Sequence, residues 1–253
     1  MLTKVKIEEN LKALGVSLPV VFFDETDSTN TRAKEYAKAN SDNNTPVLFV
    51  ANSQTAGRGR MGRSFVSNEN AGIYMSLLAY PDERGFNSTS VTAKAAVAIC
   101  RAVDDLCGVE TEIKWVNDVY LGGKKLAGVL CEGEVLQNGK IGYSIIGMGI
   151  NVYKNAISDE ISHIATSIQS ESKVVPNRSL LAAKIIEKIL KSNASDFEEY
   201  KKRSMVIGKT IRVIKHDIQY EATVKDLNSD YSLEIEHDGI TEKLFTGEVS
   251  IKI

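Results

Sequence analysis

Strand-like segments that follow one another directly, with few helices between them, are the feature that most narrows the possible folds. Helical periodicity with capping residues appears at 27–40, 88–108 and 177–204. Because several strands are consecutive rather than alternating with helices, the chain is expected to be α+β, with a mixed β-sheet flanked by helices. Alternating or β-branched runs predict the strands of this sheet at 19–24, 45–53, 71–80, 112–118, 126–135 and 140–152.

The character of the chain changes after Ser204. Short alternating runs separated by turn residues predict strands at 208–214, 218–227, 231–239, 240–247 and 248–253. Strands this short and closely spaced are typical of a small SH3-like β-barrel, so we expect two domains, 1–205 and 206–253. Residues 206–253 hold six Lys or Arg against nine Asp or Glu. This acidic balance argues against a phosphate-binding surface on the barrel.

The bulk composition excludes several classes of partner. The 253 residues carry a net charge of −2, so no global field would attract a nucleic acid or a membrane surface. Cys100, Cys107 and Cys131 lie in apolar surroundings without CxxC spacing, which is typical of reduced core thiols and not of a disulfide or zinc site. We therefore expect a cytoplasmic protein that binds no nucleic acid and no membrane.

The segment SQTAGRGRMGRSF, at 53–65, places three arginines among three glycines. No acidic residue occurs between Asp42 and Glu69, so nothing nearby in the sequence neutralises these charges. A dinucleotide fingerprint requires a helix after the glycines, and the following RSFVSNENAG predicts none. A solvated hairpin is a second interpretation, although such loops usually mix both signs of charge. We favour an anion-binding loop, whose backbone N–H groups and guanidinium groups would bind a phosphate or a carboxylate.

Two further segments point to a ligand pocket. KWVNDVYLGGKKLAGVL, at 114–130, brings Lys125 into an apolar strand with a small Ala–Gly step, which suggests an amine directed into a pocket. A plain β-hairpin around a buried Trp115 is the alternative for this segment. GMGIN, at 147–151, ends an apolar strand, and its glycines would let a flat ligand lie against the backbone.

In this order the segments resemble those of the biotin protein ligases, or biotin–[acetyl-CoA-carboxylase] ligases. The catalytic core of that family carries S-T-N, Q-x-A-G-R-G-R-x-G-R-x-W, K-W-P-N-D, K-x-x-G and G-x-G-x-N. The corresponding residues here stand at 28–30, 54–65, 114–118, 125–128 and 147–151. The resemblance runs from about residue 20 to the end of the chain and implies a class II synthetase-like core followed by the small barrel.

The sequence departs from the family pattern at two positions. Phe65 stands where the family usually has Trp, which keeps an aromatic ring but reduces its contact area. Val116 replaces the proline of the turn. About 18 residues precede the first core strand, too few for the winged helix-turn-helix that many bacterial members carry. The chain is therefore expected to resemble the monofunctional members without an N-terminal DNA-binding domain.

The resemblance implies a two-step reaction that uses ATP and Mg²⁺. The carboxylate of biotin attacks the α-phosphate of ATP, and the resulting biotinyl-5′-AMP transfers biotin to a lysine of the biotin carboxyl carrier protein of acetyl-CoA carboxylase or a related biotin-dependent enzyme. A homodimer is compatible with this family. Implied catalytic residues are Arg60, Lys125 and Asp118, and no side chain is implied as a metal ligand. Implied biotin-binding residues are Ser28, Thr29, Asn30, Gln54, Gly57, Arg58, Gly59, Arg60, Phe65, Tyr74, Ser76, Lys125 and Gly128. Implied nucleotide-binding residues are Arg58, Arg60, Lys114, Asn117, Asp118 and Asn151.

Three other functions remain open at this stage. A lipoate–protein ligase shares the acyl-adenylate chemistry, but its substrate lacks a ureido group and it typically lacks the Gly–Arg loop. A non-enzymatic biotin sensor is disfavoured because Lys125 and all three arginines are retained. A nucleic-acid-binding protein is disfavoured by the acidic barrel. We also expect the Gly–Arg loop to be the least ordered part of the empty protein, because the cost of ordering its arginines is offset only when an anion is bound.

Overall fold

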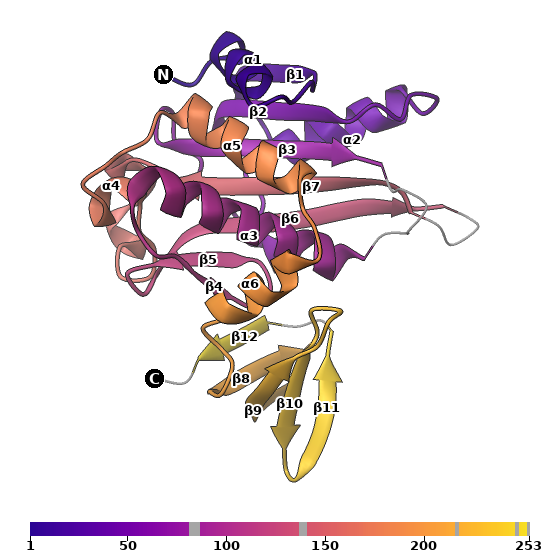
Figure 1. The fold of residues 1–253 in the computed structure, drawn as a ribbon, viewed down its shortest axis with the longest axis vertical. Helices are drawn as coiled ribbons and strands as arrows, with labels where there is room; N and C mark the ends of the chain where they lie inside the picture. Colours follow the sequence, from indigo (N-terminus) through magenta and orange to yellow (C-terminus); the bar gives the residue numbers. More distant parts are fainter. Residues whose placement is uncertain (81–86, 137–140, 216–217, 246–247, 252–253) are drawn as a thin grey trace.

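The computed structural model describes residues 1–80, 87–136, 141–215, 218–245 and 248–251. Two sheets lie one above the other in Figure 1, a larger one with helices around it and a smaller one at the C-terminal end. The α+β class expected from the sequence is confirmed.

The larger sheet has seven strands in the order β1-β2-β3-β7-β6-β5-β4 (Figure 1). The β1–β2 pair is parallel and every other pair is antiparallel, so the sheet is mixed. The consecutive strands β4 to β7 pair with one another in chain order as an antiparallel meander. The strands are β1 (Val20–Thr26), β2 (Val47–Gln54), β3 (Gly72–Ala79), β4 (Glu112–Lys114), β5 (Asp118–Leu121), β6 (Lys124–Val135) and β7 (Ile141–Asn151).

Helices cover both faces of this sheet because its strands alternate two apolar sets of side chains. In β2, Leu48 and Val50 belong to the main core under α3 (Ser88–Cys107) and α5 (Arg178–Leu190). Val47 and Phe49 face the other way and form a second cluster with Ala33 of α2 (Thr29–Ala39). Figure 1 shows α3 and α5 in front of the sheet and α2 behind it.

Helix boundaries follow local capping chemistry. The side chain of Asn87 accepts hydrogen bonds from the backbone N–H groups of the first turn of α3, and Gly108 ends that helix with φ 65°. The helical pattern at 177–204 is divided between α5 and α6 (Ser195–Arg203), because Asn193 caps the start of α6 by accepting a hydrogen bond from the Ser195 N–H. The remaining helical segments are α1 (Lys4–Ala13), α4 (Ile168–Glu171) and the 3₁₀ turns Arg60–Gly62, Lys154–Ala156 and Asp159–Ile161.

Two expectations about individual elements were wrong. The strand expected at 112–118 is two strands, β4 and β5, because residues 115–117 form a turn between them. The first 18 residues also contain α1, which no helix prediction covered. Its buried Ile7 and Leu11 join the main core, so tertiary packing stabilises a helix with a weak local signal.

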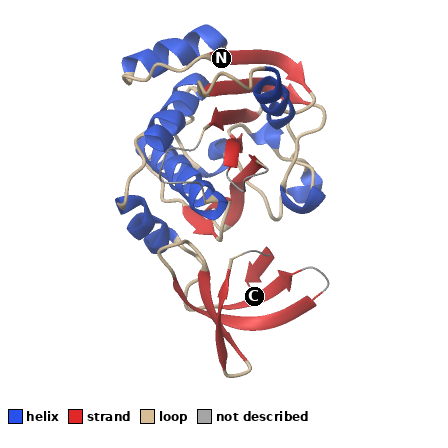
Figure 2. Cartoon of the chain, turned by 90° about the vertical axis from the view of Figure 1, so that its right-hand side faces the viewer, coloured by secondary structure: helices blue, strands red, loops and turns tan. Residues whose placement is uncertain are grey.

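The smaller sheet is antiparallel throughout and has the order β11-β10-β9-β8-β12. Figure 2 shows it as a separate layer of strands beyond the helices. Its contact with the larger sheet includes the buried indole of Trp115, whose Nε1–H donates to the Tyr231 carbonyl at 2.8 Å. The boundary at residue 205 remains a prediction. The strands are β8 (Thr210–Lys215), β9 (Ile218–Leu227), β10 (Leu233–His237), β11 (Ile240–Leu244) and β12 (Glu248–Ile251).

An ion-pair cluster fastens α6 to α3 above the smaller sheet. Arg101 pairs with Asp196 and Glu199, each at 2.5 Å. Arg203 pairs with Glu199 at 2.7 Å and with Asp104 at 2.5 Å. Glu199 thus joins two arginines from different helices.

Among the helices in the described part of the chain, none is long and apolar enough to cross a membrane.

Candidate active site

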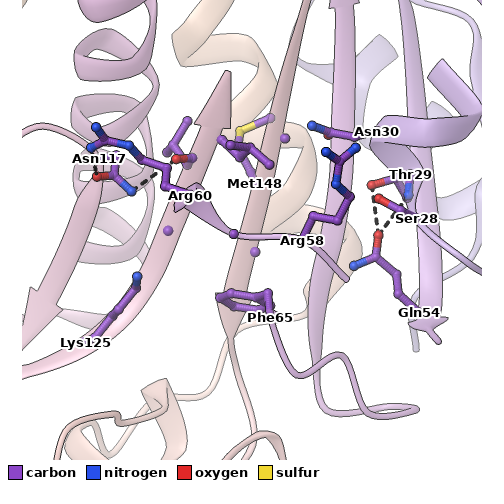
Figure 3. A pocket seen from close by; sticks show the side chains of 16 residues that line it. Ser28, Thr29, Asn30, Gln54, Arg58, Arg60, Phe65, Asn117, Lys125 and Met148 are labelled. Atoms are coloured by element: carbon purple, nitrogen blue, oxygen red, sulfur yellow. Dashed lines mark hydrogen bonds between the residues drawn. The ribbon is translucent and has the colours of Figure 1, made fainter. Parts of the chain in front are cut away.

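A pocket of about 480 Å³, including the part open to solvent, lies where the N-terminus of α2 meets β6, β7 and the Gly–Arg loop (57–65). Its size is within the range of ordinary small-molecule sites. Figure 3 shows labelled side chains from these four elements around it, together with Gln54 from the end of β2 and Asn117 from the turn before β5. The lining residues are Ser28, Thr29, Asn30, Gln54, Arg58, Gly59, Arg60, Phe65, Asn117, Lys125, Gly128, Val129, Leu130, Gly147, Met148 and Gly149.

One end of the pocket is bounded by neutral polar groups, which we call the neutral wall (Thr29, Asn30, Gln54, Ser67 and Ser76). Gln54 Oε1 accepts a hydrogen bond from the Thr29 backbone N–H at 2.8 Å, and Gln54 Nε2 donates to Ser67 Oγ at 2.9 Å. Ser76 Oγ lies 2.7 Å from Thr29 Oγ1 and 2.6 Å from Asn30 Oδ1. Amides and hydroxyls held this way suit a ligand that presents neutral donors and acceptors.

The start of α2 adds Ser28 to this end of the pocket. Ser28 occupies the N-cap position, but its hydroxyl makes no capping hydrogen bond. Its backbone N–H donates to Asp27 Oδ1 at 2.6 Å instead. Burial opposes ionisation of Asp27, but this bond and the neighbouring Arg32 outweigh it and lower the pKa of the carboxyl. Asp27 therefore anchors the start of α2, and Ser28 lines the pocket.

Positive charge gathers away from the neutral wall. Arg60 Nη1 donates to Asn117 Oδ1 at 2.8 Å, and Figure 3 places this pair on the side of the pocket that carries Lys125. Arg58 lies between the two ends and pairs with Glu132 Oε1 at 3.3 Å. The sequence offered no nearby acid to neutralise the loop, and the fold brings one from β6. Guanidinium and ammonium groups in this arrangement favour a bound carboxylate or phosphate.

Residues at the end of the turn after β4 fix the side chain of Lys125, which lies on β6. Lys125 Nζ lies 2.7 Å from Asp118 Oδ1, which also accepts a hydrogen bond from Asn117 Nδ2 at 2.7 Å. Asn117 Nδ2 lies 3.2 Å from the Val129 carbonyl oxygen as well. A Cβ on Gly128 would lie 3.3 Å from Lys125 Nζ, so the glycine keeps the space beside the ion pair open. The Lys-Trp-Val-Asn-Asp segment thus positions an amine in the pocket.

The Gly–Arg loop folds back on itself as a tight hairpin. The Phe65 N–H donates to the Gly57 carbonyl at 2.9 Å, and the Gly59 N–H donates to the Arg63 carbonyl at 2.7 Å. A Cβ on Gly57 would lie 2.3 Å from the Phe65 carbonyl oxygen, so this approach requires glycine. Gly62 near the tip has φ 74°, in the left-handed region that favours glycine. The glycines therefore serve the hairpin, and no helix follows them as a dinucleotide fingerprint would need.

An aromatic ring spans the middle of the pocket. Phe65 packs on the β7 backbone, where a Cβ on Gly149 would lie 2.6 Å from its ring atoms. Tyr74 stands edge-on to Phe65 with the ring centroids 6.4 Å apart, and burial raises the pKa of the Tyr74 hydroxyl above its usual range. A Cβ on Gly147 would lie 2.3 Å from Asn30 Oδ1. The two glycines of GMGIN thus admit the ring and the amide that bound the pocket.

The structure brings together most of the residues that the sequence singled out. The predicted site residues that line the pocket are Ser28, Thr29, Asn30, Gln54, Arg58, Gly59, Arg60, Phe65, Asn117, Lys125 and Gly128. Gly57, Tyr74, Ser76 and Asp118 lie behind the lining and contact it. Their roles in binding and catalysis stay predictions.

Two predicted nucleotide-binding residues lie outside this lining. Lys114 sits on the edge strand β4 with its ammonium 5.9 Å from the centre of the Tyr120 ring. Asn151 is buried, and its Nδ2 donates to the Thr166 carbonyl at 3.1 Å, which ties the 161–167 segment to the end of β7. The nucleotide-binding role of each remains a prediction.

Other pocket residues were missed by the sequence reasoning. Val129, Leu130 and Met148 contribute apolar lining from β6 and β7. Strand periodicity places Val129 and Leu130 on opposite faces of the sheet, and it could not have indicated that this part of β6 borders a ligand. Glu132 was missed as well, because its two contacts, with Arg58 and Asn30, depend on segments far away in the chain.

The pocket beside this seven-stranded mixed sheet has the chemistry that suits a small molecule with a neutral polar group at one end and an anionic group at the other. A family model described as the Biotin/lipoate A/B protein ligase family matches residues 22–151. The chain belongs to this family. It is 30% identical over 200 residues to a Biotin--[acetyl-CoA-carboxylase] ligase of Mycobacterium tuberculosis, a match that covers 75% of this chain and 72% of that one.

Other relatives extend the likeness to longer proteins and to solved structures. The Bifunctional ligase/repressor BirA of Bacillus subtilis is 38% identical over 169 residues, which are 66% of this chain and 51% of the relative. The chain thus spans about half the length of that relative. A structure of a biotin protein ligase from Aquifex aeolicus in complex with biotin and ATP superposes with a TM-score of 0.78 at 26% identity, covering 92% of this chain and 98% of the other.

Proposed function

We propose that this protein is a biotin ligase that attaches biotin to a lysine of the biotin carboxyl carrier protein through biotinyl-5′-AMP. The observation that carries the proposal is the division of one pocket into a neutral wall and a cationic side. Biotin has a neutral ureido ring at one end and a carboxylate at the other, and it matches this division. Relatives with this fold are biotin ligases by name, and one was solved with biotin and ATP.

The first proposed step joins two anions, which sets what the pocket must supply. The biotin carboxylate attacks the α-phosphorus of ATP, the bond to the β-phosphate oxygen breaks, and pyrophosphate leaves. Arg58, Arg60 and Lys125 offset the repulsion and hold the two reactants in line. The Asn117 hydrogen bond fixes Arg60, and Asp118 fixes Lys125, so the charges are oriented before the ligands arrive.

The second proposed step transfers the biotinyl group to an amine. The carrier lysine attacks the acyl carbon as a neutral amine, AMP leaves, and one proton is lost from the nitrogen. Asp118 is the carboxylate in the site suited to assist that proton, since its Oδ1 already borders the Lys125 ammonium. The Gly–Arg hairpin shields the reactive mixed anhydride from water.

Further parts of the proposal concern metal, partner and compartment. Mg²⁺ is a cation that proteins commonly bind together with substrate phosphates, and we propose that it arrives with the ATP triphosphate. The macromolecular partner would be the carrier domain of acetyl-CoA carboxylase or of a related biotin-dependent enzyme. The cytoplasmic location and an action without nucleic acid remain part of the proposal, and a homodimer is compatible with it.

A single assay tests the function. The protein is incubated with Mg²⁺, ATP and either biotin or lipoate, and pyrophosphate release and the mass of an added carrier domain are measured. We expect pyrophosphate release with biotin and one biotinyl mass increment on the carrier lysine. Release with lipoate alone would assign the pocket to the lipoate branch of the family. No release with either acid would refute the ligase proposal and favour a binding protein.

A further inference from the structure

Glu132 is an acidic residue at the edge of a pocket that otherwise attracts anions. It lies on β6, and its two carboxylate oxygens have different partners. Oε2 accepts a hydrogen bond from Asn30 Nδ2 at 2.7 Å, and Oε1 pairs with Arg58 at 3.3 Å. Both partners line the pocket, whereas Glu132 itself lies just behind it. Each partner is a donor, and only a carboxylate offers two acceptor oxygens and no hydrogen to them.

The Asn30 amide has only two orientations available. It packs against β7 so closely that a Cβ on Gly147 would lie 2.3 Å from its Oδ1. The carboxylate of Glu132 selects the orientation in which Nδ2 faces Glu132. Asn30 Oδ1 must then face Ser76 Oγ, 2.6 Å away. A hydroxyl has one hydrogen, and this orientation of the amide gives Ser76 an acceptor in Asn30 Oδ1, its nearest neighbour.

The same count of hydrogens continues to Thr29. Its Oγ1 lies 2.7 Å from Ser76 Oγ, and this contact needs one hydrogen between the two oxygens. The Ser76 hydrogen thus has a second acceptor in reach, Thr29 Oγ1, whose own hydroxyl donates to Gln54 Oε1 at 3.1 Å. Gln54 Oε1 also accepts a hydrogen bond from the Thr29 backbone N–H at 2.8 Å. The bonds that end at Glu132 are therefore those from Ser76 to Asn30 and from Asn30 to Glu132, and both run in one direction.

We propose that Glu132 is a positioning residue that fixes the orientation of the Asn30 amide and the direction of the Ser76–Asn30 hydrogen bond in the neutral wall, and thereby the specificity of the wall for the ureido ring. The inference rests on the proposed biotin ligase function for the identity of the ligand. The geometry excludes a role of Glu132 as a counter-ion for Arg58 alone, because its closer partner is the neutral Asn30 amide. If the direction of these hydrogen bonds were reversed, the wall would present donor hydrogens at positions where the donors of the ligand need acceptors.

Glu132→Gln tests this directly because the amide has one acceptor and one donor group. Arg58 attracts the amide oxygen, so the NH₂ group of residue 132 turns toward Asn30. Asn30 then flips, and Ser76 donates to Thr29 instead. We expect the KM for biotin to rise about tenfold, the loss of about 1.4 kcal/mol, with kcat and the KM for ATP changed less than threefold. Glu134→Gln makes the same charge change at an exposed position on β6 and should leave all three constants unchanged.

An exchange of the two groups provides the rescue. In Asn30→Asp/Glu132→Gln, the new carboxylate accepts from Ser76 and from the residue-132 amide, whose oxygen accepts from Arg58. The original direction is restored, and the KM for biotin should return to within about threefold of wild type. Asn30→Asp alone places two carboxylates together and should bind biotin worse than either parent. A Glu132→Gln variant indistinguishable from Glu134→Gln, or a double variant no better than Glu132→Gln, would overturn the proposal.

An NMR measurement on the ligand-free protein separates this inference from the proposed function. In the wild type, the Asn30 side-chain NH₂ protons should show cross-relaxation to the Glu132 γ-protons. In Glu132→Gln they should show it to the Ser76 β-protons instead. Unchanged contacts in the variant would refute the wall direction even if biotin ligation is confirmed. If the NMR contacts switch as expected but the protein does not activate biotin, the role of Glu132 in the hydrogen-bond direction is supported and biotin is excluded as the ligand.

Discussion

Gly149→Ala offers a test of how the GMGIN strand shapes the pocket. The glycine lies on β7 beneath the ring of Phe65, and its backbone is not in the left-handed region, so alanine causes no backbone strain. The new Cβ would lie 2.6 Å from both Cε1 and Cζ of Phe65, where ordinary contact begins at 3.4 Å. The ring must therefore retreat by about 0.8 Å or turn aside.

The expected cost falls on binding more than on folding. Phe65 is only half-buried and its ring atoms are the far end of a side chain, so the fold should lose about 1 kcal/mol or less, at the low end for overpacking. A displaced ring gives up its stacking on the ligand, which for an aromatic contact is about 0.5–1.5 kcal/mol. The KM for biotin should therefore rise roughly two- to twelvefold.

A double-mutant cycle checks the mechanism. The KM for biotin is measured in biotin-dependent pyrophosphate exchange for wild type, Gly149→Ala, Phe65→Ala and the double variant, with unfolding free energies from urea titration. Gly142→Ala is the matched control, because it lies on the same strand and its new Cβ would lie 3.0 Å from the Leu136 side chain and 3.7 Å from that of Glu134, away from Phe65. Without the ring, Gly149→Ala should have no further effect. A full additional loss in the Phe65→Ala background would refute the clash.

Three further predictions concern stability and thiol chemistry. Trp115→Phe removes the buried N–H that donates to the Tyr231 carbonyl and should lower the free energy of unfolding by about 1–3 kcal/mol, measured by urea denaturation. Burial opposes ionisation of Glu199, but hydrogen bonds from two arginines outweigh it and lower its pKa below 4.5. Its stabilising contribution is therefore present above about pH 4.5 and lost as the pH falls through the folded-state pKa, so Glu199→Gln should be less stable than wild type at pH 7 and closer to it at pH 3. Burial raises the pKa of the Cys100 thiol to about 12, so a disulfide reagent at pH 8 should label it slowly in the folded protein and quickly in denaturant, and fast labelling of the folded protein would contradict the burial.

The parts of the fold that are local in the chain could be predicted from the sequence. Strand periodicity located β1, β2, β3, β6 and β7 to within a few residues, and Gly108 was identified as the end of α3. Local sequence signals did not predict the helices and helix boundaries that depend on tertiary packing or on a single capping residue. The α1 helix depends on burying Ile7 and Leu11 against residues far away in the chain. The division between α5 and α6 depends on the Asn193 cap within an otherwise continuous helical pattern.

The candidate site shows the same limit. Its motifs were readable because each is contiguous, and the side chains of Gln54, Phe65 and Lys125 meet at one pocket. The contacts between the motifs could not be predicted from the sequence. Asn30 and Glu132 are 102 positions apart, and they meet because α2, which carries Asn30, packs on β7 and β6 is the neighbour of β7 in the sheet. Charge counted along the chain therefore suggested that the Gly–Arg loop had no acidic partner.

By itself, the sequence determined the kinds of element, the chemistry of each motif and the resemblance to a ligase family, because these depend on residues near one another in the chain. Only the tertiary structure decided which motifs face each other, that Glu132 stands between Arg58 and Asn30, and that Lys125 is held by Asp118. The physical reason is strand order and register, which set distances between residues that no local propensity relates. The division of the pocket into a neutral and a cationic end is a property of that arrangement.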